Sequence, residues 1–225
     1  MNQKIKLVVF DMAGTTIDED NVVYKTIQNT LNQYNFNFTL TEVLVNCAGK
    51  EKRQAIKDVL RFKDIEQTDE QINTIFESFK ENLKEAYATL TVKSFKGVEE
   101  LFTTLKEKQI KIALNTGYDL ITAKSLLNNL NWKEGVEFDT LVTADDVEKG
   151  RPFPDMIYKA MDRTGITSSE HVAKIGDSIV DIAEGKSANC KYTIGVTTGA
   201  QNRNQLQTAN PTYIFDQLSE LLNHI

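Results

Sequence analysis

The sequence predicts an α/β fold in which a doubly wound parallel sheet carries an inserted all-helical cap. From residue 94 onward, short β-branched runs alternate with longer amphipathic segments, an order typical of parallel strands with helices on both faces. One strand-like run near the N-terminus is followed, from about residue 20 to residue 90, by helical periodicity alone. We therefore expect a core formed by residues 1–17 and 94–225 and a helical cap formed by residues 18–93.

The first predicted strand, residues 5–10, is short, apolar and rich in β-branched side chains, and Asp11 ends it. A run of this kind is typical of a strand that is buried on both faces of a sheet. The segment that follows changes to apolar residues about four apart on one helix face. The helical runs expected in the cap cover residues 23–31, 54–62 and 72–87.

Helix and strand then alternate to the end of the chain. The expected helices cover residues 98–108, 119–130, 155–163, 179–188, 201–207 and 216–222. The expected strands cover residues 110–114, 140–143, 172–176, 192–196 and 213–215. Asp119 is the expected N-cap of one helix, and Gly165 is expected to end another. Because open α/β sheets bind ligands beyond the carboxyl ends of their strands, functional residues are expected at that edge.

The composition argues against several classes of function. Lys and Arg total 26 against 32 Asp and Glu, and the resulting net charge of −6 does not suit a protein that coats nucleic acid or anionic membrane. Two histidines and two cysteines are too few for a His-rich metal cluster, a cysteine-based zinc site or a disulfide scaffold. No apolar run near the start is long enough for a signal peptide or a membrane span. We expect a cytoplasmic protein without nucleic-acid or membrane partners, whose chemistry rests on carboxylates, lysine, arginine and hydroxyls.

Four groups of chemically reactive residues fall at or just after the predicted strand ends, or in a loop before a helix. They are residues 11–16, 115–118, 149–152 and 176–181. Any one of them is explained by ordinary turn or helix-cap chemistry. Together at one edge of a sheet they bring carboxylates, which hold a hard cation, to a hydroxyl, backbone N–H groups and a guanidinium, which hold phosphate oxygens. The pattern predicts a metal-assisted phosphoryl site.

These four segments resemble the four motifs of the haloacid dehalogenase superfamily, and the resemblance runs through the whole chain. It implies that Asp11 attacks phosphorus and forms an aspartyl-phosphate, which water then hydrolyses. The implied phosphate-binding groups are Thr116, the N–H of Gly117 and Arg151. The implied Mg²⁺ ligands are Asp11, the backbone carbonyl of Ala13, Asp177 and Asp181.

At two positions the sequence departs from the general pattern of the superfamily and resembles its phosphonatase branch instead. Ala13 stands where most members carry a second aspartate, and Arg151 stands where most carry lysine. The second aspartate protonates the leaving alcohol in phosphatases, and alanine cannot do this. In phosphonatases a cap lysine forms a Schiff base with the substrate aldehyde, and the iminium accepts electrons from the breaking carbon–phosphorus bond.

The resemblance puts Lys52 in the Schiff-base position. The crowding of Lys50, Lys52 and Arg53 at a helix N-terminus also favours a neutral, nucleophilic amine. Lys50 is the alternative, with Glu51 as a possible salt-bridge partner.

Three further positions depart from the branch. Ala48 replaces a methionine, Ala55 replaces a histidine, and polar residues near Asn21 replace a cysteine. Because of these differences, the resemblance alone does not identify the substrate. Tyr118 agrees with the branch and is expected either to line the substrate pocket or to pack in the core.

We therefore expect a Mg²⁺-dependent hydrolase that cleaves the carbon–phosphorus bond of a small 2-oxoalkylphosphonate. One alternative is a phosphatase for a small phosphate ester, in which Lys52 only binds substrate. The other is a non-catalytic phospho-ligand binding protein, although a binder would not need a nucleophile. The resemblance also implies a homodimer formed through the cap helices.

Overall fold

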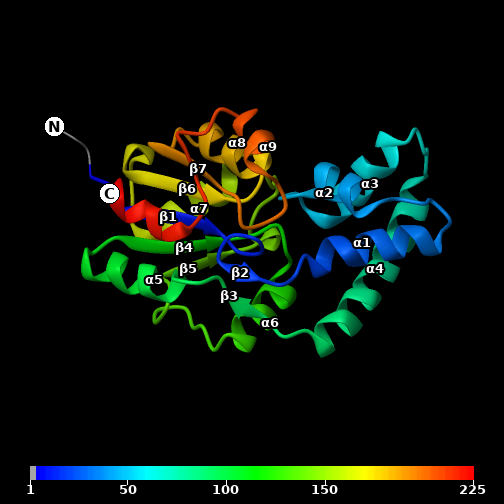
Figure 1. Ribbon diagram of the computed structural model, residues 1–225, viewed down its shortest axis with the longest axis horizontal. Helices are drawn as coiled ribbons and strands as arrows, with labels where there is room; N and C mark the ends of the chain where they lie inside the picture. Colours follow the sequence, from blue (N-terminus) through cyan, green and yellow to red (C-terminus); the bar gives the residue numbers. More distant parts are fainter. Residues whose placement is uncertain (1–3) are drawn as a thin grey trace.

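The computed structural model describes residues 4–225, and its centre is a six-stranded parallel sheet (Figure 1). The strands across the sheet are, in order, β5 (Thr140–Val142), β4 (Lys111–Asn115), β1 (Leu7–Asp11), β6 (Val172–Gly176), β7 (Tyr192–Val196) and β8 (Tyr213–Phe215). The chain runs from β1 outward to β4 and β5, then crosses back to β6 and continues outward on the other side. The strand order therefore reverses at β1, where open sheets of this kind bind their ligands.

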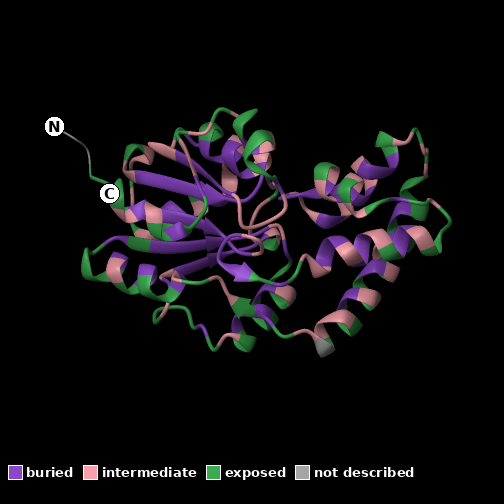
Figure 2. Ribbon diagram, viewed as in Figure 1, coloured by how far each residue is buried: buried purple, intermediate pink, exposed green. Residues whose placement is uncertain are grey.

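Helices cover both faces of the sheet, which confirms the predicted fold class. The core helices are α5 (Val98–Glu107), α6 (Leu120–Asn129), α7 (Asp155–Thr164), α8 (Ile179–Ser187) and α9 (Arg203–Gln207). Every residue of β1 is buried, and Figure 2 shows the sheet as a largely buried layer. Leu7 and Val9 pack in one apolar cluster with Ile157 of α7, whereas Val8 and Phe10 belong to the cluster on the other face. This alternation is the period of two that a strand imposes.

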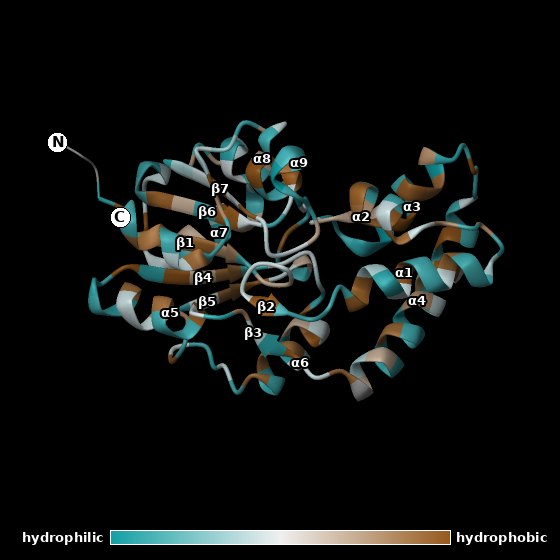
Figure 3. Ribbon diagram, viewed as in Figure 1, coloured by the Kyte–Doolittle hydropathy of each residue, from teal (hydrophilic) through white to brown (hydrophobic). Residues whose placement is uncertain are grey.

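The segment between β1 and α5 contains the three helices expected there and a fourth, at residues 40–47, that the sequence did not predict. They are α1 (Val22–Gln33), α2 (Leu40–Cys47), α3 (Lys52–Phe62) and α4 (Asp69–Thr89). Helix α1 packs against α4 and α2 against α3, and Figure 3 shows these helices with mixed apolar and polar faces. Thr39 and Thr68 begin α2 and α4 with reciprocal capping boxes.

A short antiparallel ribbon joins the points where the chain leaves and re-enters the core. Its strands are β2 (Ile17–Asp18) and β3 (Lys93–Ser94), with Ile17 opposite Ser94 and Asp18 opposite Lys93. The sequence did not predict this ribbon, because two residues are too few to display a strand period. The expected division between core and cap falls within the ribbon and remains our proposal.

Most element boundaries agree with the sequence within one or two residues. Asp119 caps α6 by accepting from the Thr122 amide at 2.8 Å, and Gly165 ends α7 with φ at +70°. The predicted last α-helix at residues 216–222 was wrong, because this segment is a 3₁₀ helix, Leu218–Asn223. Leu218 and Leu221 are buried three residues apart, and this spacing matches three residues per turn.

Two shorter 3₁₀ turns, Ala144–Asp146 and Ser169–His171, complete the connections. Of the helices described between residues 4 and 225, none has the length and apolarity needed to cross a membrane.

Phe102 of α5 packs between Phe10 of the sheet and Trp132, and its truncation tests this packing. It is 2% exposed, and its ring centre lies 5.3 Å from that of Phe10 and 5.3 Å from that of Trp132. We expect Phe102→Ala to lower the free energy of unfolding by about 3–5 kcal/mol, because the lost contacts leave a cavity. The matched control is Ile121→Ala, because Ile121 is also in a helix but is 83% exposed. This substitution should change the free energy of unfolding by less than about 0.5 kcal/mol. Urea unfolding measures both, and equal losses would contradict this account of the core.

Candidate active site

The register of the sheet brings three of the sequence motifs together. Asp11 at the end of β1 is paired with Asn115 on β4, and Phe10 is paired with Ile175 on β6. The residues that follow these strand ends, among them Thr116 and Asp177, therefore come to one edge.

Three buried carboxylates meet at this edge. One oxygen from each of Asp11, Asp177 and Asp181 lies within 4.8 Å of the others. Ser178 is the N-cap of α8 and donates its hydroxyl to Asp181, while Asp177 accepts from the Ala200 amide at 2.6 Å. All three have less than 6% of their surface exposed.

Arg151 connects these carboxylates to the neighbouring strand. Its guanidinium lies 2.7 Å from Asp11, 3.0 Å from Asp181 and 3.1 Å from Glu184. It also donates to the backbone and side-chain oxygens of Asn115, at 2.8 Å each. Because a planar guanidinium has five N–H groups, it can satisfy this many acceptors at once.

Lys174 is a second buried cation in the site, and the sequence analysis missed it. Its side chain has 0% exposure, and its amine lies 2.9 Å from Asp181, 3.3 Å from Glu184 and 2.7 Å from the Asn115 side-chain oxygen. The signal was a lysine inside the otherwise apolar strand at residues 172–176, where a buried charge requires partners.

The buried charges do not balance. Asp11, Asp177, Asp181 and Glu184 carry four negative charges when ionised, and Arg151 and Lys174 supply two positive ones, which leaves a net charge of −2.

This imbalance is visible in the pKa values of the aspartates. Burial raises the pKa of Asp177, with Asp11 and Asp181 adding to the effect, and burial also raises the pKa of Asp11 against the opposing charge of Arg151. Burial also opposes ionisation of Asp181, but Arg151 and Lys174 outweigh it and lower its pKa.

These residues fit a hard divalent cation. All the side-chain donors are carboxylate oxygens, which such ions prefer, and two positive charges would offset the net charge of the cluster. The Asp181 Oδ1 atom lies 3.0 Å from Arg151 and 2.9 Å from the Lys174 amine, so these two cations already compensate part of its charge. Ala13 lies in the loop after β1, and the role of its carbonyl stays a prediction.

The predicted phosphate-binding residues lie at the same edge. The Thr116 hydroxyl accepts from the Tyr118 amide at 3.2 Å, so its own proton can be donated to a ligand. Thr116 and Arg151 are both buried. Gly117 stands where a side chain would not fit, because a Cβ there would lie 2.9 Å from the Lys50 carbonyl oxygen.

The loop between α2 and α3 lies directly against the core. Besides the contact of Lys50 with Gly117, a Cβ at Gly49 would lie only 2.3 Å from the Ser178 hydroxyl. Gly49 also has φ at +73°, a conformation that glycine adopts without strain. The start of α3 therefore lies close to the loops after β4 and β6.

Lys52 is the first residue of α3, and 8% of it is exposed. Its amine donates to the Lys50 carbonyl at 2.9 Å and lies 5.0 Å from the ring centre of Tyr118 and 5.3 Å from that of Tyr24. Burial lowers the pKa of Lys52, Arg151 adds to this effect, and the charge of Asp11 opposes it. The main cause is therefore burial rather than the crowded helix N-terminus that the sequence suggested.

Lys50 has a different environment. Its amine pairs with Asp58 at 2.6 Å, and 29% of its side chain is exposed. The expected partner Glu51 instead caps α3 by accepting from the Arg53 and Gln54 amides.

Tyr118 packs in the core, because it is 3% exposed, and its ring centre lies 5.0 Å from the Lys52 amine, while a role in lining a substrate pocket stays a prediction. The same region holds Glu19, which is 3% exposed and accepts from the Tyr87 hydroxyl at 3.0 Å. Sequence reasoning missed Glu19, because it follows β2 in no recognisable motif.

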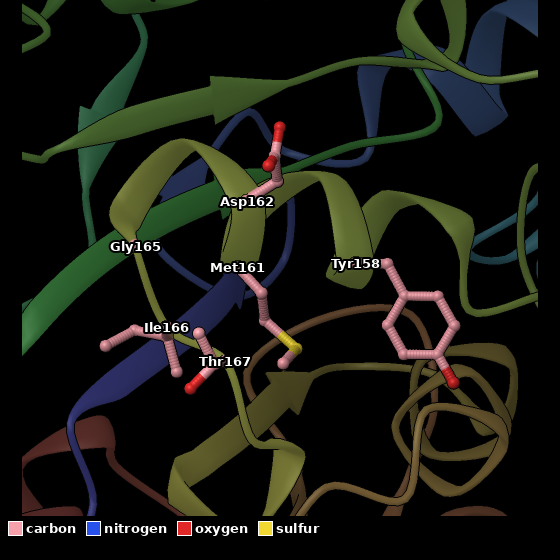
Figure 4. Close-up of a pocket in the computed structure, with 6 residues that line it drawn as sticks. All are labelled: Tyr158, Met161, Asp162, Gly165, Ile166 and Thr167. Atoms are coloured by element: carbon pink, nitrogen blue, oxygen red, sulfur yellow. The ribbon is translucent and has the colours of Figure 1, made fainter.

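A separate shallow cavity of about 290 Å³ lies at the C-terminal end of α7 (Figure 4). It is lined by Tyr158, Met161, Asp162, Gly165, Ile166 and Thr167. Because α7 runs against the strand direction and leads into β6, this cavity lies at the opposite edge of the sheet from the candidate site.

Comparisons with known proteins agree with this geometry. Residues 8–196 match the family model described as haloacid dehalogenase-like hydrolase. The phosphonoacetaldehyde hydrolase of Bacillus thuringiensis (strain Al Hakam) is 31% identical over 214 residues, which cover 88% of this chain and 77% of that protein.

Two solved structures share the fold. A phosphonoacetaldehyde hydrolase-like protein from Oleispira antarctica superposes with a TM-score of 0.87 at 23% identity, over 99% of this chain and 91% of that chain. A phosphoglycolate phosphatase, described as predicted, from Haemophilus somnus 129pt superposes with a TM-score of 0.79 at 20% identity, over 97% of each chain. The match of the family model over most of the chain identifies this enzyme as a member of the haloacid dehalogenase-like hydrolase family.

Proposed function

We propose that this hydrolase cleaves the carbon–phosphorus bond of a small 2-oxoalkylphosphonate such as phosphonoacetaldehyde. The observation that carries the proposal is the buried amine of Lys52 in the same site as Asp11, in a chain that has Ala13 two residues after Asp11. Ala13 cannot protonate a leaving group, whereas an amine can activate a substrate carbonyl. The relatives named phosphonoacetaldehyde hydrolase support the same substrate class.

In the proposed first step, the neutral amine of Lys52 attacks the carbonyl carbon, the oxygen takes up a proton from a general acid as well as one from the nitrogen, and water leaves, which forms an iminium ion. The lowered pKa of Lys52 favours this step, because a larger fraction of the amine is unprotonated near neutral pH. The rings of Tyr118 and Tyr24 shield the amine from water.

In the second step, a carboxylate oxygen of Asp11 attacks phosphorus. The electron pair of the carbon–phosphorus bond moves to the iminium, so that an enamine and an aspartyl-phosphate form. Arg151 and Thr15 each contact one oxygen of Asp11, at 2.7 and 3.2 Å, and so orient the carboxylate. Thr116, the Gly117 amide and Arg151 would hold the phosphoryl oxygens.

Water then hydrolyses the aspartyl-phosphate and releases phosphate. The enamine is protonated on carbon, and hydrolysis of the resulting iminium releases the aldehyde and restores the Lys52 amine. Mg²⁺ held by Asp11, Asp177, Asp181 and the Ala13 carbonyl would supply positive charge for the phosphoryl oxygens.

Replacement of Lys52 tests the carbonyl activation. We expect Lys52→Arg to lower phosphate release from phosphonoacetaldehyde by about 10⁴-fold or more, because a guanidinium does not form the Schiff base. Borohydride added with substrate should trap a covalent adduct on the wild-type protein and none on Lys52→Arg, as measured by mass spectrometry.

The matched control is Lys50→Arg, because Lys50 pairs with Asp58 and lies two residues away. It should trap the adduct as the wild-type protein does. Efficient turnover of p-nitrophenyl phosphate, without trapping and without activity on phosphonoacetaldehyde, would instead support the phosphatase. Absence of turnover on both substrates with Mg²⁺ present would support the binding protein.

Replacement of Asp11 tests the nucleophile. Asp11→Asn keeps the shape of the side chain but removes the carboxylate that would attack phosphorus. We expect it to abolish phosphate release from phosphonoacetaldehyde while borohydride trapping on Lys52 remains. Full phosphate release by this variant would remove Asp11 from the mechanism.

Replacement of Asp177 tests the cation site without use of activity. Without Mg²⁺, Asp177→Asn should melt at the same or a higher temperature than the wild-type protein, because it removes a buried charge that Asp11 and Asp181 repel. Added Mg²⁺ should raise the melting temperature of the wild-type protein and have little effect on the variant. The control is Asp162→Asn, an exposed aspartate of α7, which should keep the Mg²⁺ response. An equal response from Asp177→Asn would exclude Asp177 as a ligand.

A further inference from the structure

Glu19 is a buried carboxylic acid that the proposed reaction does not use. It lies between β2 and α1, and 3% of it is exposed. The Tyr87 hydroxyl of α4 donates to it at 3.0 Å, and interactions with Tyr118 and the Val23 backbone lower its pKa. The carboxyl group is therefore buried and fixed to α4 by a hydrogen bond.

Tyr118 interacts with both this carboxyl group and Lys52. The Lys52 amine lies 5.0 Å from the centre of the Tyr118 ring, and Tyr118 also lowers the pKa of Glu19. Each charge also affects the other, because Lys52 lowers the pKa of Glu19 and Glu19 raises that of Lys52. The two buried groups are therefore close enough to interact electrostatically.

The titration of Glu19 differs from that of the other groups around Lys52. Burial raises the pKa of Glu19 to about 7, although Tyr87 and Lys52 oppose this effect. Burial raises the pKa of the neighbouring Cys47 thiol to about 12, and it raises those of the Tyr24, Tyr87 and Tyr118 hydroxyls well above their usual value. The remaining charged neighbours, Asp11 and Arg151, contact each other. Among the described groups that face Lys52, Glu19 can both give and take a proton near neutral pH.

We propose that Glu19 is the acid–base partner of Lys52, and that its carboxyl group carries protons between the lysine nitrogen and the carbonyl oxygen of the substrate. This inference rests on the Schiff-base step of the proposed function and adds the group that makes the step possible. It assigns a role to a residue that lies outside all four sequence motifs.

The proton balance of the step is complete with these two residues. The Lys52 nitrogen attacks the carbonyl carbon, the C=O electron pair moves to oxygen, and Glu19 transfers one proton from nitrogen to that oxygen. Glu19 in its acid form then protonates the resulting hydroxyl, which leaves as water while the nitrogen lone pair forms the C=N bond. The products are the iminium, one water and the Glu19 carboxylate. The reverse sequence, with the carboxylate taking a proton from attacking water, releases the aldehyde and restores both residues.

Reductive trapping of acetaldehyde on Lys52 isolates this step, because acetaldehyde has no phosphorus to be cleaved. We expect Glu19→Gln to slow the trapping with cyanoborohydride at neutral pH by about 10²-fold or more, since glutamine is isosteric but cannot transfer the proton. Glu85→Gln is the matched control, because Glu85 is an exposed glutamate of α4 two residues from Tyr87. It should trap at the wild-type rate.

The pH profile separates proton transfer from a structural effect. In the wild-type protein, the trapping rate should fall as pH rises above about 7, because Glu19 then loses its acid form. This alkaline decline should vanish in Glu19→Gln. In Tyr87→Phe it should move to higher pH, because the Tyr87 hydroxyl bond lowers the Glu19 pKa and the variant lacks it.

The outcomes distinguish the two proposals. If the wild-type protein traps neither acetaldehyde nor phosphonoacetaldehyde, the Schiff-base function fails and the role of Glu19 fails with it. If the wild-type protein traps acetaldehyde and Glu19→Gln does so at the same rate and with the same pH profile, the role of Glu19 alone is overturned. If the rate falls in Glu19→Gln while the profile keeps its alkaline decline, the role of Glu19 is likewise overturned.

Discussion

The ionic contacts of Arg151 are the constraint on which the rest of the site depends. A guanidinium buried this deeply is stable only when nearly all of its N–H groups have acceptors. Those acceptors come from β1, through Asp11, from β4, through Asn115, and from α8, through Asp181 and Glu184. A displacement of any one of these elements would leave a buried charge without a partner. The contacts of Arg151 therefore fix the arrangement of this edge of the sheet.

The cluster around Arg151 also explains why a cation suits the site. Two buried bases offset only part of the charge of four carboxylates. Burial raises the pKa of Asp177 and Asp11, and Asp181 adds to this effect at both. Glycines allow the loops to approach this charge closely, since a Cβ at Gly14 or Gly199 would lie within 2.4 Å of the Asp177 carboxylate. The loops therefore approach Asp177 more closely than side chains at these two positions would permit.

The proposed role of the cap in the chemistry also depends on burial. Lys52 and Glu19 have pKa values displaced toward neutrality in opposite directions, because each is removed from water and each retains only partial compensation. Their positions depend on the loop that carries Gly49 and Lys50, which contacts Ser178 and Gly117 of the core. The fit between cap and core therefore controls both the distance of Lys52 from Asp11 and the dielectric environment of its amine.

The sequence by itself determined the fold class, the family and the strand ends at which Asp11, Thr116 and Asp177 lie. Periodicity and motif order are properties of the linear sequence, so no tertiary contact is needed to recognise them. Only the tertiary structure showed the different environments of Lys52 and Lys50, since Lys52 is buried whereas Lys50 is partly exposed and pairs with Asp58. It also brought Tyr87 to Glu19 and Arg151 to Asp11, pairs that are 68 and 140 residues apart. The physical reason is that burial and long-range ion pairs, rather than residue type, set the charge state of a group, and neither is encoded in a local pattern.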